Sequence, residues 1–462
     1  MQSLADAIIE ENIPLIQDII RSGEVLNQLD EYGFTPLVEA AIANNIEIAK
    51  LLLMQGADAN LPDMTGGTAL HWAAENNNVK LAKLLLHYHA DPNAYNFSGQ
   101  PVLTMPYLRQ QTELKNTLVS AGAQLAFTQD YINTKLLGHM FELVGIANII
   151  SPNNQFVEVD FEGFVLEFSL SVIADSVLQF QNHFAVRKLR RYMNLINVII
   201  ETLSRAAKLI RYQQYQVDID QHQTEIRPLI QQEPLIIPIG YEGHAITFIK
   251  LGNLLVKCDR REDSRLYDNV VIYQINRPEV MTNEFIQKLI FSKQDWETIN
   301  NSLPQWLNLQ PITEIKLAAQ VSGNCSWANV EACLPTLFFL LSSQNEDFEA
   351  NILRYKNLAL DFFKQWREWN KDRSLQFCLQ SFRDGDSIRK ACKAEILAAI
   401  LYQSCNSGSM LDRDRAESII SVIGTQKYEY ILQNYIKTYC YEDSSEEGKN
   451  FLQLLKSLGY RT

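Results

Sequence analysis

The sequence predicts a multidomain α+β protein: an N-terminal all-α solenoid of repeats, then an α+β domain, then a helical C-terminal subdomain. Three observations support this prediction. A period of 33 residues runs through about the first 125 positions, short β-branched runs separated by turn residues follow between 235 and 275, and helical periodicity dominates beyond position 345. We therefore expect four segments, with the bounds 1–125, 126–235, 236–345 and 346–462.

The period is visible in three glycines, Gly33, Gly66 and Gly99, which lie 33 residues apart. The stretches F-T-P-L-V-E-A-A and G-T-A-L-H-W-A-A are equivalent, and each is followed by A-K-L-L-L and then by G-A-D-A-N or H-A-D-P-N. This is the ankyrin pattern, in which each unit has two antiparallel helices and a β-turn loop. One unit cannot bury its apolar face alone, so the units must stack. We expect about four repeats over residues 1–125, with the first and last degenerate.

Ankyrin stacks have no catalytic chemistry of their own and bind proteins through their loop tips and concave helix face. Exposed aromatic side chains are frequent anchors in such contacts. The alternative is that some of these side chains pack against the rest of the same chain, with Trp72 the most ambiguous. We predict a host-protein contact surface at the variable tips and on one first helix, made of Glu31, Tyr32, Phe34, Met64, Thr65, Trp72, Tyr95 and Phe97.

The segment 126–235 lacks the period and is predicted to contain a β-hairpin and helices. Residues 156–168 alternate apolar and acidic side chains about Glu162-Gly163, which is typical of a hairpin with one solvated face. Helices are expected over about 172–211. They carry a basic cluster that is either a nucleic-acid or nuclear-import patch or, more commonly for such runs, a solvated helix face: Arg187, Lys188, Arg190 and Arg191.

Composition and charge argue against several classes of function. A net charge of -13 disfavours general affinity for nucleic acid. No apolar run approaches the roughly 18 residues of a membrane span, and the N-terminal residues lack the layout of a signal peptide. All seven cysteines occur from Cys258 onward without paired C-x-x-C spacing. This pattern indicates a reduced, intracellular protein without a disulfide framework or a zinc site. We expect no metal and no cofactor.

Residues 243–259 offer a histidine and an acid that are expected to meet. His244 opens an apolar, β-branched run over 245–249, Gly252-Asn253 is a turn signal, and 254–258 is predicted to be the returning strand. In a tight antiparallel hairpin, Asp259 then lies across from the start of the first strand, within reach of the His244 ring.

Residues 320–329, Q-V-S-G-N-C-S-W-A-N, offer a nucleophile. Cys325 precedes Trp327, which shares a helix-face spacing with later apolar residues, so the sulfur is expected at a helix N-terminus, where the helix dipole lowers a thiol pKa. We predict Cys325 as nucleophile, His244 as base, Asp259 as orienting acid and Gln320 as oxyanion donor, with Asp263 and Asp268 as alternative acids. The competing interpretation is that Cys325 is a small core residue, as most buried cysteines are.

The order His, Asp, Gln, Cys resembles the cysteine proteases that include the SUMO and ubiquitin-like proteases, the adenovirus protease and the YopJ-type acetyltransferases. The resemblance implies a cysteine-protease-like core over 236–345. Two features depart from the usual pattern: Gln320 is one residue closer to Cys325, and no aromatic residue follows His244. Papain shares the Gln and the Cys-Trp pair, but its chain order is Cys before His.

The acidic run 442–447 and the apolar helix after it resemble the glutamate-rich C-terminal signal of effectors exported by the Legionella type IV secretion system. With the repeats, the chain resembles the Legionella ankyrin-repeat effectors. The resemblance implies translocation into the cytosol or nucleus of a host cell and binding of a host protein. Two functions follow: a binding effector that carries a protease-like domain, which the sequence favours, or an active thiol hydrolase or acyltransferase, similar to a deubiquitinase or deSUMOylase, that acts on the recruited protein.

Overall fold

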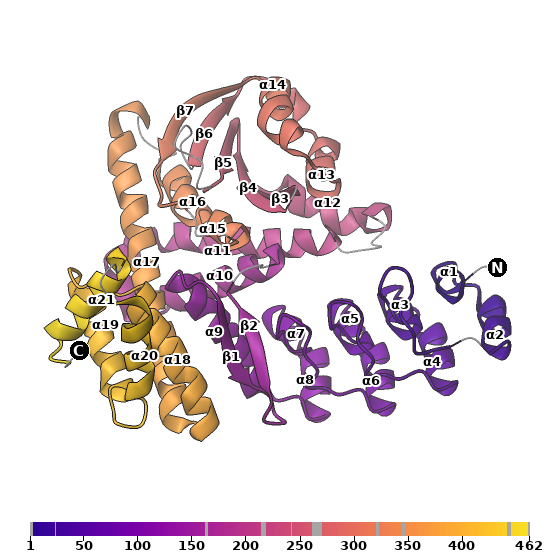
Figure 1. Ribbon diagram of the computed structural model, residues 1–462. Helices are drawn as coiled ribbons and strands as arrows, with labels where there is room; N and C mark the ends of the chain where they lie inside the picture. Colours follow the sequence, from indigo (N-terminus) through magenta and orange to yellow (C-terminus); the bar gives the residue numbers. More distant parts are fainter. Residues whose placement is uncertain are drawn as a thin grey trace. The chain divides into compact units, whose positions relative to one another are not determined.

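The structure, a computed structural model, describes residues 3–23, 25–161, 165–213, 219–241, 243–260, 270–319, 323–343, 348–440 and 445–460 (Figure 1). The chain forms two compact units. The first comprises Met1–Gly138, Gly145–Asp160 and Gln376–Thr462, and the second comprises His139–Val144 and Phe161–Leu375. Each unit therefore joins segments that are distant in the sequence.

The first unit begins with stacked pairs of antiparallel helices, the architecture predicted from the 33-residue period (Figure 1). Polar residues fix where the helices begin: the side chain of Thr35 accepts from Val38 N at the start of α3, and Asn78 caps α6 in the same way. α7 has five residues, including Pro106, whereas α3 and α5 have seven each, so the first helix of the last pair is shortened. The helices are α1 Leu4–Ile9, α2 Ile13–Arg21, α3 Pro36–Ile42, α4 Ile46–Met54, α5 Ala69–Glu75, α6 Val79–His87, α7 Thr104–Leu108 and α8 Thr112–Ser120.

Three asparagines at the repeat period join each repeat to the next. Asn27 Oδ1 accepts from Asp58 N at 2.8 Å, Asn60 Oδ1 accepts from Asp91 N at 2.7 Å, and Asn93 Oδ1 accepts from Gln124 N at 2.8 Å. Each side-chain NH₂ group also donates to a backbone carbonyl of the next repeat. These bonds satisfy backbone groups that loops would otherwise leave unpaired.

The rest of the first unit consists of a hairpin and helices from both ends of the sequence: α9 Leu125–Met140, β1 Ile146–Ile150, β2 Phe156–Asp160, the end of α17 Phe348–Asp384, α18 Ser387–Gln403, α19 Met410–Ile423, α20 Glu429–Tyr439 and α21 Glu446–Ser457. β1 and β2 pair antiparallel, Ile150 opposite Phe156. The position predicted for the hairpin, about Glu162-Gly163, is wrong: residues 156–160 form the second strand of the β1–β2 hairpin, and helix α10 begins at Leu166. Glu162 and Gly163 themselves lie outside the described residues.

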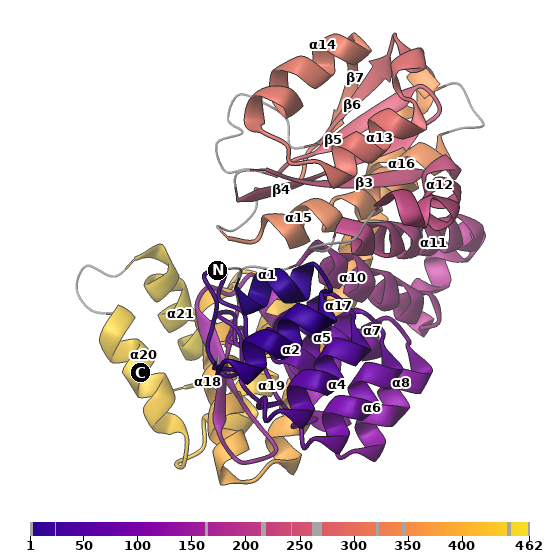
Figure 2. The same ribbon diagram turned by 90° about the vertical axis from the view of Figure 1, so that its right-hand side faces the viewer.

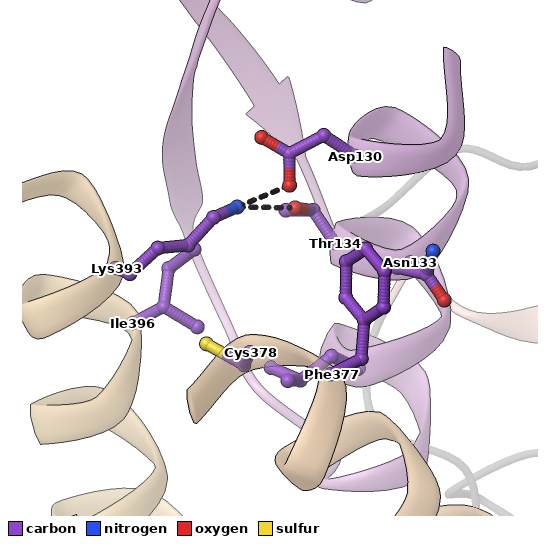
Figure 3. A pocket seen from close by; sticks show the side chains of 8 residues that line it. Asp130, Asn133, Thr134, Phe377, Cys378, Lys393 and Ile396 are labelled. Carbon is purple, nitrogen blue, oxygen red and sulfur yellow. Dashed lines mark hydrogen bonds and ion pairs between the residues drawn. The ribbon is translucent and has the colours of Figure 1, made fainter. Parts of the chain in front are cut away.

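The helices α18 to α21 pack within the first unit, whereas most of α17 belongs to the second. α18 packs on β1, and its Lys393 ammonium ion-pairs with Asp130 and donates to Thr134 Oγ1 at 3.3 Å (Figure 3). Both partners belong to α9, more than 250 residues earlier in the sequence. The ion pair borders a pocket that Cys378 also lines. Part of the acidic run 442–447 lies outside the described residues.

The second unit surrounds a five-stranded antiparallel sheet of strand order β3-β4-β5-β6-β7. β7 was not predicted from the sequence. The strands are β3 Leu235–Tyr241, β4 His244–Leu251, β5 Leu254–Cys258, β6 Val270–Ile275 and β7 Leu309–Ile315. The helices are α10 Leu166–Gln181, α11 Met193–Ile210, α12 Gln223–Gln231, α13 Asn283–Phe291, α14 Leu303–Leu307, α15 Cys325–Glu331, α16 Cys333–Ser342 and most of α17, with short 3₁₀ or π turns at Phe184–Tyr192, Arg211–Gln213, Ile219–His222, Pro278–Val280 and Thr298–Ser302.

Helices cover both faces of this sheet. Apolar residues of α12, α13 and α14 share one core with the inward residues of β3 and β4, such as Ile237 and Phe248. α15 and α16 pack against β4 as well, and Figure 2 shows α15 running close to that strand. The stretch Cys325–Ser342 has the length and hydropathy of a membrane span, but 83% of it is buried inside the protein. It therefore has the burial of a core helix pair that supports the sheet.

Candidate cysteine nucleophile site and ankyrin tips

Three elements bring the predicted nucleophile, base and acid to one end of the sheet. His244 is the first residue of β4, Asp259 directly follows β5, and Cys325 is the first residue of α15. β4 and β5 form the expected tight hairpin, in which Leu251 pairs with Leu254. Because the strands are antiparallel, the start of β4 lies beside the end of β5. Since α15 packs on β4, the sulfur joins the same end of the sheet.

The histidine ring is held by the acid. His244 Nε2 donates to Asp259 Oδ1 at 2.9 Å, with both side chains largely buried. Lys257 Nζ lies 3.3 Å from Asp259 Oδ2, so a cation favours the ionised acid. The Tyr241 ring packs edge-on against the imidazole, with centroids 5.6 Å apart. With Nε2 bound to the acid, Nδ1 is the ring nitrogen that remains for the sulfur.

The surroundings of the Cys325 sulfur favour the thiolate. The backbone N–H of Ala245 donates to Sγ at 3.3 Å. Burial alone raises the pKa of this thiol, but the hydrogen bond from His244, the Ala245 N–H and the charge of His244 outweigh it, so the pKa is lowered. By contrast, burial raises the pKa of Cys378 to about 12 and that of Cys392 to about 11. Cys325 is therefore set apart chemically from these core cysteines.

The described residues bring together a thiol, an imidazole and a carboxylate, the three kinds of group that thiol-based acyl transfer uses. Gln320, the predicted oxyanion donor, lies outside the described residues, as do the alternative acids Asp263 and Asp268. Within the described part of the chain, no group of three or more His, Cys, Asp or Glu side chains is placed to hold a metal ion.

Sequence reasoning missed the residues that hold this arrangement together. Asn329, fully buried on α15, donates from Nδ2 to the Ala245 carbonyl at 2.7 Å and accepts at Oδ1 from Arg260 N at 2.8 Å. Arg260 forms a buried ion pair with Glu331, Nη1 to Oε2 at 2.9 Å. Trp327 is buried and stacked on His139 with centroids 4.5 Å apart, so it packs the helix instead of lining an open groove. Only the spacing of Asn329 four residues after Cys325 hinted at a shared helix face.

The predicted partner contacts at the repeat tips fall into two groups. Five are exposed: Glu31, Tyr32, Met64, Thr65 and Phe97. Their loops are linked in a row, because Met64 N donates to Gly33 O at 2.8 Å and Phe97 N donates to Thr65 O at 2.9 Å. The exposed tips therefore form one connected surface.

The other three predicted contacts are half-buried and pack against this chain. Trp72 Nε1 donates to Asp63 Oδ2 at 2.9 Å, and its ring lies edge-on to Phe34 at 6.3 Å. Tyr95 lies edge-on to Phe127, with ring centroids 6.0 Å apart. These contacts agree with the alternative that some tip aromatics stabilise the chain's own structure.

Comparison with known proteins identifies the class of the repeats and a protein to which the whole chain is similar. The ankyrin-repeat family matches residues 4–96 in three copies, so the chain is an ankyrin-repeat protein. The structure of the Legionella effector AnkH is similar along almost the full length, with a TM-score of 0.89, 39% sequence identity, and coverage of 99% of this chain and 98% of that chain. This chain therefore belongs to the family of the Legionella effector AnkH. No curated protein matches it.

Proposed function

We propose that the protein is a bacterial effector, secreted into a host cell, that binds a host protein through its ankyrin repeats and attacks an acyl group with Cys325. Membership of the AnkH family and the exposed, connected repeat tips support the first part. The observation that carries the second part is the convergence of Cys325, His244 and Asp259, with His244 Nε2 2.9 Å from Asp259 Oδ1 and Ala245 N 3.3 Å from the sulfur.

The proposed reaction proceeds through a thioester. His244 Nδ1 takes the proton of Cys325, and the thiolate attacks a carbonyl carbon, forming a C–S bond as the carbonyl oxygen becomes an oxyanion. Gln320 is the proposed donor to that oxyanion. The oxyanion then collapses, the bond to the leaving nitrogen or sulfur breaks, and the imidazolium gives its proton to the leaving group. Water or an amine, deprotonated by His244, cleaves the thioester and restores the thiol.

The substrate class that we propose is an amide, isopeptide or thioester of a recruited host protein. Ubiquitin-like conjugates are the first candidates because of the resemblance to ubiquitin-like and SUMO proteases. The second candidate function is a binding effector whose protease-like domain is inactive. The one-residue shorter spacing between Gln320 and Cys325 favours this alternative, since a misplaced oxyanion donor costs rate.

Labelling with ubiquitin- and SUMO-vinyl sulfone separates the two functions. We compare the wild-type protein with Cys325→Ala, His244→Ala and Cys440→Ala, the last as a control at the other half-exposed cysteine. The proposal expects covalent labelling of the wild-type and Cys440→Ala proteins by one of the probes and none of the other two variants. Labelling that is equal in wild type and His244→Ala would contradict an activated thiolate and favour the inactive domain.

A further inference from the structure

The ladder between β4 and β5 ends just before Asp259 on β5's side and short of His244 on β4's side. Its last pair is Thr247 opposite Cys258, and the same register would place Ile246 opposite Asp259 and then Ala245 opposite Arg260, the pair that would form the next hydrogen-bonded rung. That rung does not form. The Ala245 N–H donates to Cys325 Sγ at 3.3 Å, its carbonyl accepts from Asn329 Nδ2 at 2.7 Å, and Arg260 N donates to Asn329 Oδ1 at 2.8 Å. The Asn329 side chain thus occupies the place of the missing rung.

We propose that Asn329 is the positioning residue of the Cys325 site: its carboxamide keeps β4 and the chain after β5 apart, so that the Ala245 N–H faces the sulfur and Asp259 stays beside His244. This inference rests on the proposed function, because it concerns the same site. Asn329 touches no reacting atom and acts through the backbone on either side of His244 and Asp259.

The chemistry of this position suits asparagine. The Ala245 carbonyl needs a donor and the Arg260 N–H needs an acceptor, and a carboxamide presents one of each. Aspartate has no donor when ionised, and leucine of similar size has neither group. Asn329 is fully buried, so loss of either bond would leave a buried backbone group unpaired.

The location of Asn329 on α15 explains how one side chain can influence all three functional residues through their neighbours in the chain. It lies four residues after Cys325, on the same face of the helix. Arg260 is fixed to that helix a second time, through Nη1 to Glu331 Oε2 at 2.9 Å and to the Ala328 carbonyl at 3.3 Å. The helix that carries the nucleophile therefore also determines where the chain after Asp259 runs.

Without the carboxamide, the two strands are free to close. Ala245 and Arg260 would then pair as the next rung, and the Ala245 N–H would turn from the sulfur to a backbone carbonyl. Asp259 lies directly before Arg260 and would shift with it. Both changes remove stabilisation from the thiolate and its imidazolium partner.

The first test is the pH dependence of Cys325 alkylation by iodoacetamide, followed by site-resolved mass spectrometry in the full chain. Asn329→Ala and Asn329→Leu are compared with Asn370→Ala, a fully buried asparagine of the same unit whose Oδ1 accepts from Ser176 Oγ at 2.8 Å. We expect both Asn329 variants to move the midpoint upward by about one pH unit, which is roughly a tenfold loss of rate at lower pH. Asn370→Ala should leave it unchanged, whatever its effect on Tm. An unchanged midpoint in the Asn329 variants overturns the proposal.

A crystal structure of Asn329→Ala, which empties the place of the missing rung, tests the same claim without relying on reactivity. The expected result is a ladder extended by the Ala245–Arg260 pair, with Ala245 N farther from Sγ than the present 3.3 Å. An Ala245 N that stays at this distance overturns the proposal. If wild-type Cys325 titrates near the ordinary thiol value of about 8.5, the proposed function fails, and this structure still decides the role of Asn329.

Discussion

At the residue scale, the state of the Cys325 sulfur is decided by a competition between burial and its hydrogen bonds. Burial favours the neutral thiol, whereas His244 and the Ala245 N–H favour the thiolate, and the pKa ends below its usual value. Because the pKa of Cys325 is lower in the folded protein, its thiolate stabilises the folded state. This stabilisation is fully present above the ordinary thiol pKa and is lost as the pH falls through the lowered pKa. The reactivity of Cys325 should therefore decline in acid and persist at neutral pH.

The role of Asp259 is tested by Asp259→Asn. The substitution keeps the shape but removes the charge that steadies the His244 imidazolium, so we expect the rate of probe labelling at Cys325 to fall by about 100-fold or more. Lys257→Ala, which removes the neighbouring cation and leaves the acid in place, should cost much less. Equal labelling rates in wild type and Asp259→Asn would show that this carboxylate does not support the histidine.

The three proposed reacting or orienting residues could be predicted because each sits next to a local signal: a turn between two apolar runs for His244 and Asp259, and a helix start for Cys325. Asn329 and the Ala245 N–H could not. Their roles depend on the strand register and on a helix 84 residues along the chain that packs against the strand. Periodicity in one sequence does not specify which groups meet across such a distance.

At the element scale, the repeat tips depend on glycines that let neighbouring loops approach closely. Gly66 has φ +81°, and a Cβ there would lie 2.5 Å from Phe97 N. The Phe97 amide is the group that donates to Thr65 O and so links the two tips. The same glycine that marks the sequence period thus permits the contact between repeats.

Gly66→Ala is expected to weaken this contact. The left-handed conformation costs an alanine about 1 kcal/mol, and the collision with the Phe97 backbone adds about 1–3 kcal/mol. Gly56→Ala is the matched control, because Gly56 has φ +96° and no atom within 4 Å of the added Cβ. Hydrogen exchange at the Phe97 amide measures the difference. Equal protection in both variants would mean that the tip contact does not depend on the missing Cβ.

The elements themselves were predictable to different degrees. The ankyrin helices follow from a period that repeats, and the β4–β5 hairpin follows from its turn residues. β1 and β7 were missed, β7 because Pro311 and polar residues interrupt its apolar pattern. Residues after 164 alternate apolar and polar side chains, which predicted a strand, but they form α10 because tertiary packing overrides so short a pattern.

At the scale of the whole molecule, the first unit is assembled from segments at opposite ends of the sequence, and the Lys393–Asp130 ion pair is one of its joints (Figure 3). Lys393→Ala leaves a mostly buried carboxylate without its cation, so we expect a loss of about 3–5 kcal/mol of stability. Lys83→Ala, at the exposed pair with Glu113, should cost less than about 1 kcal/mol. Chemical unfolding, monitored by hydrogen exchange in α9 and α18, measures the loss of stability in each variant. Similar costs for both variants would contradict the structural importance of the buried pair.

Binding of the host partner and the reactivity of Cys325 are assigned to different residues, so a substitution at the repeat tips should change the first without changing the second. The combined change of Tyr32, Met64 and Phe97 to alanine should weaken binding of the host partner by about tenfold or more per anchor residue, while the alkylation rate of Cys325 stays as in wild type. Binding is measured with the purified partner once it has been captured. Undiminished binding in this variant would place the partner surface elsewhere on the protein.

The most direct test of an activated nucleophile compares two cysteines within the same wild-type molecule. Cys325 and Cys440 are both half-exposed, but the pKa of Cys325 is lowered, whereas burial raises that of Cys440. We expect iodoacetamide at pH 7 to modify Cys325 at least about tenfold faster, and the His244→Ala substitution to remove that advantage. Equal rates at the two cysteines in the wild-type protein would contradict the account and leave the ankyrin repeats as the functional part of the molecule.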